Sequence, residues 1–465
     1  MPEADFSRFK KKPKIELISY THRKGFKDYG PDEISAFGAL ACFEQKPGTV
    51  LYDDMWLVNP KEKVNEKAEK VIQASIGKLH GAVADQNAFV LENAGLSRAT
   101  TLFMCSPQYL SFLQQSLRRA DADNWYELPD SILSEKIKEQ AVKVMDDAFK
   151  LYGEMINDKV PNEDARYVLP LYTKTNIQAI GNARELTHLH AMSQLPSVPS
   201  VTKYVIERMV DEAAKVAPKL FKDRKLNYET LAWYPAAQLY AERNETLKQI
   251  IIENRSPEKP RYIEHKLQDE TIIRAIVDRE EAELANLKHV HNGSGINGYL
   301  TFMSLVTLHQ AIRQRTWDQT VESIYDAAER AKAITPGRIE VTKWAEQYKA
   351  QCNSMFELYK MLVAYGIPKN DAIGVIPHST MIYDLIHING WNALHSIGKR
   401  TCPKAQWEIR EIAEGIALEI ARLNPKIFAY MGPQCKIYGF CPEGKPCSRF
   451  KKSFYQRVEE EKGKE

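Results

Sequence analysis

FKLYGEMINDKVPNEDARYVLPLYT at residues 149–173 returns as FELYKMLVAYGIPKNDAIGVIPHST at residues 356–380, 207 positions further along the chain. The same offset relates Ser97, Thr100, Ser116, Asn182 and His188 to Ser304, Thr307, Ser323, Asn389 and His395. At least 14 identities fall between residues 97 and 189 without a gap. Two unrelated helical stretches of similar composition are the alternative, but one fixed offset favours a tandem duplication.

The boundary between the copies is predicted at the polar stretch Asn254–Pro260, where two prolines stand among charged residues. We therefore expect a first copy at 14–250, a linker at 251–262, a second copy at 263–450 and a charged tail at 451–465.

The hydrophobic periodicity predicts a mostly helical α+β fold. Apolar residues recur at helical spacing from Ile137 to Met155, through Ala141, Val144, Ala148 and Tyr152. The second copy repeats the pattern at Val341, Trp344, Tyr348, Cys352, Met355, Tyr359 and Leu362. Strands are expected at 15–20 and around 167–173 and 374–380, which gives long helices with a small sheet in each copy.

Composition restricts the class of protein. The chain has 465 residues, 44% hydrophobic and 27% charged, with a net charge of +3, which is typical of a soluble protein and not of a dedicated nucleic-acid binder. It contains no membrane-spanning run and no signal peptide, so a cytoplasmic location is expected. Seven cysteines form no disulfide framework. Cys435, Cys441 and Cys447 with Cys402 are a candidate metal site, but their five-residue gaps favour free thiols and no metal.

A cluster of polar residues in the second copy could bind an anion. Gln310 and Arg313 share a helix face, Gln314 and Arg315 follow, and Ser323 supplies a hydroxyl. Arginine offers paired donors for phosphate, although a solvated basic helix face would look the same.

The second copy resembles flavin-dependent thymidylate synthases in three motifs that occur in the family's order: the signature, a C-terminal arginine with the block after it, and the ending from Gly432 to Lys445. Arg313-Gln314-Arg315, seven residues and Ser323 are similar to the family signature Arg-His-Arg-x7-Ser, with Gln310 matching a glutamine three residues before it. Arg400 and the block Ala405–Arg410 resemble the family's C-terminal arginine and Ala-Gln-Trp-Glu-Ile-Arg motif. Glutamine in place of histidine at 314 is a departure that puts the flavin or folate contact in doubt.

The first copy resembles the family at complementary positions. Ser116 and Arg118, Arg166 in Arg-x-Val-Leu-Pro, Asn182 and Arg184 in Asn-Ala-Arg-Glu-Leu, His188 and His80 match family positions. The first copy has lost the signature, where it reads Ser106-Pro107-Gln108, and has Phe103 and Ser193 for Gln310 and Arg400. The second copy has lost the equivalents of Arg118, Arg166 and Arg184, which are Tyr325, Ile373 and Trp391.

In the family, each active site is built from residues of different subunits of a homotetramer. The residues lost from each copy correspond to the contribution of one of these subunits. One subunit supplies the glutamine, the first signature arginine and the C-terminal arginine, and another supplies the Ser-x-Arg segment and the Arg-x-Val-Leu-Pro arginine. The first copy keeps one share and the second keeps the other. This predicts an intramolecular pseudodimer with one composite site per chain, and a homodimer that reproduces the tetramer.

The resemblance implies reductive methylation of dUMP to dTMP with FAD, NADPH and methylenetetrahydrofolate. Arg400 would orient dUMP and stabilise charge on its ring. The dUMP contacts would be Gln310, Arg313, Ser116, Arg118, Arg166 and Arg400, and the FAD contacts Arg313, Gln314, Arg315, Asn182, Arg184, His188 and His80. The alternatives are a flavoenzyme of the same fold acting on another pyrimidine nucleotide or one-carbon donor, and an inactive nucleotide-binding or scaffold protein.

Overall fold

The computed structural model describes residues 6–25, 29–76, 80–120, 122, 125–222, 236, 238–242, 244–266, 280–291, 295–428, 431–443 and 446–447. The predicted tail at 451–465 lies outside these residues. The chain divides into two compact units. Unit 1 comprises residues 1–236 and 336–377, and unit 2 comprises residues 237–335 and 378–465. The segment 336–377, which the repeat assigns to the second copy, therefore packs within unit 1.

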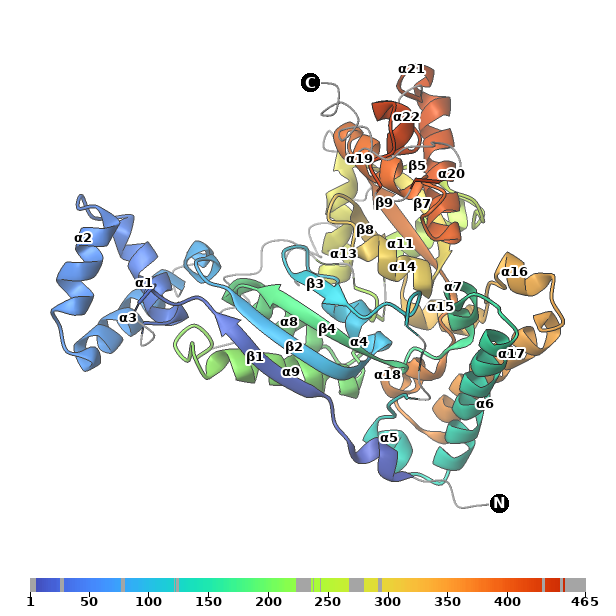
Figure 1. The fold of residues 1–465 in the computed structure, drawn as a ribbon, viewed down its shortest axis with the longest axis horizontal. Coiled ribbons are helices and arrows are strands. Elements are labelled where there is room, and N and C mark those ends of the chain that lie inside the picture. Colours follow the sequence, from blue (N-terminus) through green and yellow to red (C-terminus); the bar gives the residue numbers. More distant parts are fainter. Residues whose placement is uncertain are drawn as a thin grey trace, which may run out of the picture. The chain divides into compact units, whose positions relative to one another are not determined.

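Unit 1 is built around a four-stranded antiparallel sheet in the order β1-β2-β4-β3 (Figure 1). Its strands are β1 (Lys14–Tyr20), β2 (Phe89–Ser97), β3 (Ser111–Gln114) and β4 (Lys174–Gly181). Its helices are α1 (Pro31–Ala41), α2 (Gly48–Tyr52), α3 (Lys61–Ile76), α4 (Arg98–Met104), α5 (Asp130–Leu133), α6 (Lys138–Asn157), α7 (Asn162–Ala165), α8 (Ala183–Ser193), α9 (Ser200–Ala214), α16 (Gly337–Glu340), α17 (Ala345–Tyr365) and α18 (Lys369–Ala372). Helix α9 packs against β1 and β2, beside α8.

Unit 2 holds a second antiparallel sheet in the order β5-β7-β9-β8, with the short β6 paired to β7. Its strands are β5 (Arg261–Lys266), β6 (Val290–His291), β7 (Gly295–Ser304), β8 (Asp318–Val321) and β9 (Met381–His387). Its helices are α11 (Glu245–Glu253), α13 (Glu281–Leu284), α14 (Leu305–Ile312), α15 (Ile324–Arg330), α19 (Gly390–Arg400), α20 (Trp407–Leu423), α21 (Pro425–Phe428) and α22 (Gln434–Tyr438). The turn at 254–260 lies inside this unit, between α11 and β5.

The repeat in the sequence is a repeat in the structure. Strands β3 and β8, helices α7 and α18, and helices α8 and α19 each begin and end 207 residues apart. The predicted α+β fold, with long helices and a small antiparallel sheet in each copy, is confirmed.

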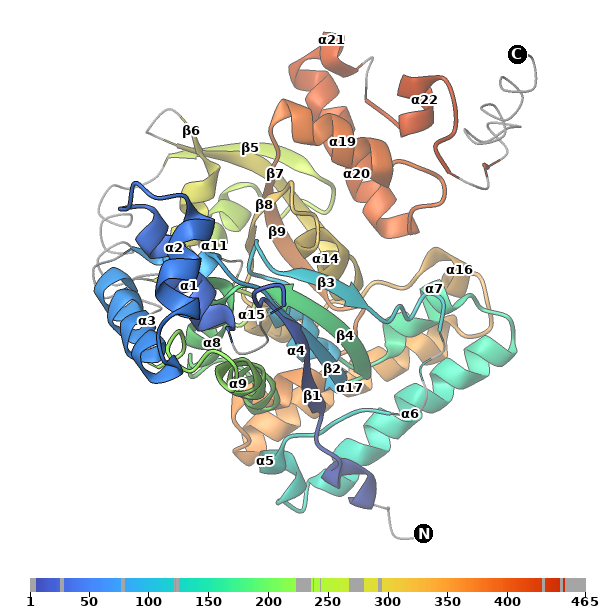
Figure 2. The same cartoon turned by 60° about the vertical axis from the view of Figure 1, so that its left-hand side comes forward.

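Helices α6 and α17 lie side by side in both ribbon views, and they show how the copies pair (Figure 2). The Nε2 of Gln351 donates to the carbonyl oxygen of Val144 at 2.9 Å, and Pro170 forms a β-bridge with Pro377. Each contact joins a position to its own equivalent 207 residues later. Residues near the twofold axis of a symmetric dimer contact their own equivalents in this way. Unit 1 thus contains a dimer-like interface within one chain.

The predicted helices are confirmed, and their apolar faces are buried. Tyr348, Cys352 and Met355 of α17 are at most 1% exposed. Val341 lies before this helix and is 84% exposed, so the apolar face begins later than its sequence pattern indicated.

Strand β1 lies where it was predicted, but the other two strand predictions were wrong. Residues 167–173 and 374–380 form short 3-10 turns and extended loops, and β4 and β9 begin only after them, at Lys174 and Met381. Pro170 and Pro377 lack the N–H that a strand would donate, so the regular ladder starts beyond each proline.

Each copy anchors the first turn of its equivalent helix with a buried carboxylate. In unit 1, Glu127 accepts a hydrogen bond from the N–H of Ser97, the residue that caps α4. In unit 2, Glu408 accepts from the N–H of Ser304, which caps α14. The two glutamates are not at equivalent positions of the repeat. The N–H of the capping serine therefore donates to a glutamate in both copies, but the glutamate comes from a different part of each copy.

The described part of the chain contains no helix that combines the length and the apolarity needed to cross a membrane.

A buried carboxyl in the unit 2 sheet gives a stability prediction. Asp384 on β9 is fully buried, and burial raises its pKa well above the ordinary value; a hydrogen bond from Gln319 at 2.6 Å opposes this only in part. Because the folded carboxyl ionises at a higher pH than the unfolded one, whose pKa is about 4, folding is progressively disfavoured as the pH rises above about 4. We expect Asp384→Asn to stabilise the protein at pH 7.5 by about 1 kcal/mol or more.

Thermal unfolding at pH 7.5 and pH 4 tests this prediction. The gain should shrink toward pH 4, because less of the unfolded carboxyl is then ionised, and Asp130→Asn, at an exposed carboxylate, should change little. An equal effect of Asp384→Asn at both pH values would show that its carboxyl is ionised in the folded protein.

Candidate functional site

Two predicted dUMP residues of the second copy, Gln310 and Arg313, lie at the end of helix α14, whose first turn is anchored by hydrogen bonds. Ser304 caps α14 by accepting from the N–H of Thr307. The carboxylate of Glu408 accepts from the N–H and Oγ of Ser304, at 2.6 and 2.5 Å, and from Oγ1 of Thr307 at 2.7 Å. This buried anchor fixes the helix that presents Gln310 in its last turn and Arg313 at its C-terminal cap.

Arg400 is the last residue of α19 and lies within electrostatic range of Arg313. Burial lowers the pKa of Arg400, and the positive charge of Arg313 lowers it further. Nε of Arg400 is buried and has no hydrogen-bond partner among the residues that the structure describes. Two neighbouring guanidiniums with an unsatisfied buried N–H favour a bound anion, which would relieve both the repulsion and the missing hydrogen bond.

Gln314, which stands where the family signature has histidine, is half-buried. Its Nε2 donates to the carbonyl oxygen of Gln310 at 2.9 Å, across one helical turn. Arg315 follows and is also half-buried. The side-chain amide of Gln314 therefore braces the end of α14.

The predicted dUMP residues of the first copy gather around Glu163. Ser116 and Arg118 lie in the turn after β3, where Oγ of Ser116 accepts from the N–H of Arg118. The guanidinium of Arg118 forms an ion pair with Glu163, whose backbone oxygen accepts from Nε of Arg166 at 3.1 Å. Burial lowers the pKa of Arg166, and the charge of Arg118 acts in the same direction. The carboxylate of Glu163, with that of Asp164 nearby, thus stands beside the two arginines.

Two of the predicted FAD residues meet at Asp85. Asn182 caps α8 with its Oδ1, and its Nδ2 donates to Asp85 at 3.1 Å. Nη1 of Arg184 forms an ion pair with the other oxygen of Asp85 at 3.0 Å. The carboxylate orients both side chains at the N-terminus of the helix.

The two predicted FAD histidines differ in their surroundings. His188 is buried in α8, one turn after Glu185, whose pKa is raised by burial. His80 is exposed and precedes the 3-10 helix at Gly81–Asp85. The structure therefore brings Asn182 and Arg184 together around one carboxylate and places His80 and His188 in unlike environments.

Two of the first copy's counterparts of Gln310, Arg313 and Arg400 are buried in unit 1: Phe103 is 1% exposed and Ser193 is fully buried. Ser106 is half-buried and lies just after α4, and its hydroxyl donates to the backbone oxygen of Leu102. The hydroxyl of Ser193 donates to the backbone oxygen of His190 within α8. These positions offer no positive charge.

The second copy's counterparts of Ser116 and Arg118 have become part of a helix. Ser323 caps α15 and is 2% exposed, and Tyr325 lies buried in its first turn. In unit 1, Ile373, the counterpart of Arg166, is fully buried. Two of the three positions that lost an arginine have therefore become buried packing positions, whereas Trp391, the counterpart of Arg184, is 80% exposed.

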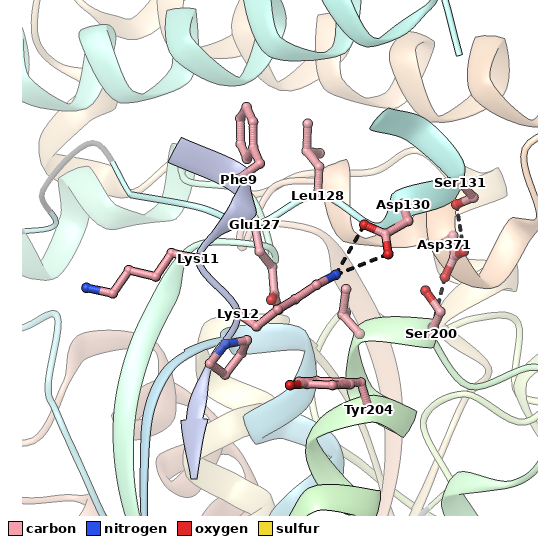
Figure 3. Close-up of a pocket in the computed structure, with 12 residues that line it drawn as sticks. Phe9, Lys11, Lys12, Glu127, Leu128, Asp130, Ser131, Ser200, Tyr204 and Asp371 are labelled. Atoms are coloured by element: carbon pink, nitrogen blue, oxygen red, sulfur yellow. Dashed lines mark hydrogen bonds and ion pairs between the residues drawn. The ribbon is translucent and has the colours of Figure 1, made fainter. Parts of the chain in front are cut away.

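A cavity of about 270 Å³ in unit 1 lies away from these residues (Figure 3). Nζ of Lys12 reaches Asp130 across it, and Asp371 accepts from Oγ of Ser131 and from the N–H of Ser200 at 2.7 and 2.8 Å. None of the predicted site residues lines this cavity. The hydrogen bonds of Asp371 with Ser131 and Ser200 join segments of both copies, which favours a structural role for this region.

Sequence reasoning missed the two carboxylates that hold the first-copy arginines. The carboxylate of Glu163 pairs with Arg118, which is distant in the sequence. Asp85 is far from Arg184 in the sequence, and no local pattern predicts that contact.

The cysteine cluster shows no sign of a metal centre in the described residues, where no group of three His, Cys, Asp or Glu side chains could hold a metal ion. Cys435 and Cys441 are buried free thiols, and Cys402 and Cys447 are half-buried.

A family model described as thymidylate synthase complementing protein matches the chain twice, over residues 16–219 and 226–426. A protein of Sulfolobus acidocaldarius named flavin-dependent thymidylate synthase is 31% identical over 212 residues, which cover 45% of this chain and 75% of that protein. One of the same name from Pyrococcus furiosus is 28% identical over 209 residues, covering 43% of this chain and 79% of its own length. Each relative thus matches less than half of this chain but most of itself, as expected if one copy corresponds to one relative.

The crystal structure of a UMP/dUMP methylase, PolB from Streptomyces cacaoi, bound with 5-Br dUMP, overlaps the chain with a TM-score of 0.36 at 16% identity. The overlap covers 47% of this chain and 93% of that one. A TM-score this low supports no argument about function.

Proposed function

Because the chain belongs, in two tandem copies, to the thymidylate synthase complementing protein family, whose relatives are named flavin-dependent thymidylate synthases, we propose that it converts dUMP to dTMP with FAD. Methylenetetrahydrofolate is the proposed carbon donor and NADPH the proposed reductant. One observation carries the proposal: the charged residues lost from one copy are retained in the other. A decaying, inactive duplicate would lose charges without that complementarity.

The proposed nucleotide contacts form one complete set per chain. The second copy supplies Gln310, Arg313 and Arg400, and the first supplies Ser116, Arg118 and Arg166. The neighbouring guanidiniums of Arg313 and Arg400 support an anionic ligand, because like charges beside a buried, unsatisfied N–H are stabilised by a counterion. Arginine also presents the paired donors that suit phosphate. Both arguments favour a nucleotide over an uncharged substrate.

The residues present suit a flavin dinucleotide by their chemistry. Arg313 and Arg315 offer cationic donors for its pyrophosphate, and Arg184 and Asn182 stand at the N-terminus of a helix, which favours negative charge. His80, His188 and Gln314 complete the proposed FAD contacts. Bound FAD would supply the redox chemistry of the reaction, and the protein would bind, orient and exclude water.

Arg400 is the proposed catalytic residue. A guanidinium that is already partly desolvated interacts more strongly with charge developing on a bound pyrimidine ring than an exposed one does. Arg313, Arg118 and Arg166 would hold the phosphate and so fix the ring relative to Arg400. Gln310 and Ser116 would add neutral hydrogen bonds.

We further propose that two chains associate, so that four copies reproduce the tetramer expected for the family. Analytical ultracentrifugation should then give about twice the mass of the 53.2 kDa chain. A stable monomer that retains activity would contradict this part of the proposal.

The activity itself is tested by incubating the purified protein with FAD, NADPH, methylenetetrahydrofolate and dUMP and following dTMP by chromatography. We expect dTMP formation that requires all four components. If a different pyrimidine nucleotide is methylated instead, the substrate assignment is wrong. If no flavin binds and no nucleotide is converted, the proposed activity is wrong.

A further inference from the structure

The loop that follows Arg313 is tied to helix α19 by one buried hydrogen bond. Nε1 of Trp317, whose residue is 5% exposed, donates to Oγ of Ser396 on α19 at 2.8 Å. We propose that Trp317 is a positioning residue: through Ser396, it fixes the loop that carries Arg313 against the helix that ends in Arg400. Neither residue belongs to the predicted nucleotide or flavin contacts.

The bond joins two short, well-defined segments. On α19, Ser396 precedes Arg400 by one helical turn and so shares its side of the helix. In the loop, the N–H of Trp317 donates to the backbone oxygen of Gln314, and the N–H of Gln314 donates to that of Ala311 at the end of α14. A displacement at Trp317 would therefore be transmitted over few residues to Arg313.

Such a tie is needed because the two arginines repel each other. Unlike charges could hold the loop and helix together by themselves, but Arg313 and Arg400 are both cations, and Arg400 is partly buried. Repulsion between like charges grows as the dielectric constant falls. Neutral contacts must then keep the pair close enough to act on one anion, and the Trp317–Ser396 bond is such a contact.

The first copy provides an internal comparison. Its equivalents of Trp317 and Ser396 are Leu110 and Leu189, both buried and both unable to form this bond. In the same copy Arg313 and Arg400 are replaced by serines. The copy that has lost the cations therefore also lacks the tie, whereas the copy that keeps them has it. If the hydrogen bond served folding alone, we would not expect it to occur only in the copy that retains the two arginines.

Hydrogen exchange of the full chain tests the inference without any ligand. In Trp317→Phe, which keeps the ring and removes the N–H, we expect faster exchange both in the peptide covering 313–317 and in the one covering 396–400. Ser396→Ala should give the same pattern. The first-copy peptides at 106–110 and 189–193 serve as internal controls and should not change. Faster exchange only around the substituted residue would overturn the inference.

Binding of dUMP by titration calorimetry gives the second arm, which rests on the proposed function. We expect Trp317→Phe and Ser396→Ala each to weaken dUMP binding about tenfold, as the loss of one positioning hydrogen bond allows. The double variant should bind dUMP about as tightly as each single variant does, because both substitutions remove the same hydrogen bond. Leu110→Ala, which creates a cavity at the equivalent position of the first copy, is the matched control. It should leave the dissociation constant for dUMP within about twofold of the wild-type value.

The two arms separate failure of the inference from failure of the proposed function. If the wild-type protein binds no dUMP, the proposed function fails, and the exchange measurement still decides whether Trp317 couples the two segments. If dUMP binds but the single variants bind it as tightly as wild type, or if their effects add in the double variant, Trp317 does not position Arg313 and the inference is wrong.

Discussion

Replacing Arg400 with glutamine is expected to lower the rate of dTMP formation by at least about 100-fold while the protein stays folded. Arg400 is a partly buried cation whose interactions with a nearby negative charge are strengthened by the loss of water, and its Nε has no hydrogen-bond partner among the described residues. Glutamine retains a hydrogen-bond donor but removes the charge. Turnover of dUMP with saturating FAD and cosubstrates, compared with wild type, gives the measurement.

The equivalent position in the first copy supplies the matched control for this variant. Ser193 is fully buried, and its hydroxyl donates to the backbone oxygen of His190. Ser193→Ala should therefore leave turnover within about twofold of wild type, at a small cost in stability. If Arg400→Gln retained more than a fifth of the activity, Arg400 would not be the catalytic residue.

Replacing Arg166 with glutamine is expected to weaken dUMP binding by about 100-fold. Arg166 is partly buried beside Arg118, and the carboxylates of Glu163 and Asp164 are nearby. Charge-assisted hydrogen bonds contribute roughly 1.5–3 kcal/mol each, so loss of a bidentate phosphate contact has an effect of this size. Calorimetric titration with dUMP, at matched ionic strength, measures it.

The second-copy counterpart of Arg166 is Ile373, and it makes the corresponding control. Ile373→Val removes one methylene group from a fully buried side chain and should cost about 1 kcal/mol of stability. It should leave dUMP affinity within about twofold, because no cation is lost. Equal losses of affinity in the two variants would indicate a general effect of destabilisation and would count against a phosphate contact at Arg166.

Much of the fold could be predicted because it follows from local patterns. The fixed offset identified the duplication, and apolar residues at helical spacing identified α6 and α17. Strands β4 and β9 were predicted too early in the sequence, at the proline-containing segments that precede them. The β-branched and aromatic residues around Pro170 and Pro377 are typical of strands, but a proline cannot donate the hydrogen bond that a strand requires.

The arrangement of the site could be predicted only in part. The arginines were found by resemblance, but the contacts that hold them depend on residues distant in the sequence. Asp85 orients Arg184, and Ser396 receives the hydrogen bond from Trp317. The packing of α17 within unit 1 is likewise a tertiary feature. No periodicity within either segment encodes such pairings.

The central claim is that each chain holds one complete set of nucleotide and flavin contacts. It is tested most directly by titrating the purified apo-protein with FAD, with and without dUMP. We predict one tightly bound FAD per chain, an affinity that depends on dUMP, and loss of tight binding in Arg313→Ala. Two equivalent FAD molecules per chain would contradict the claim, because they would require both copies to hold full sets of contacts.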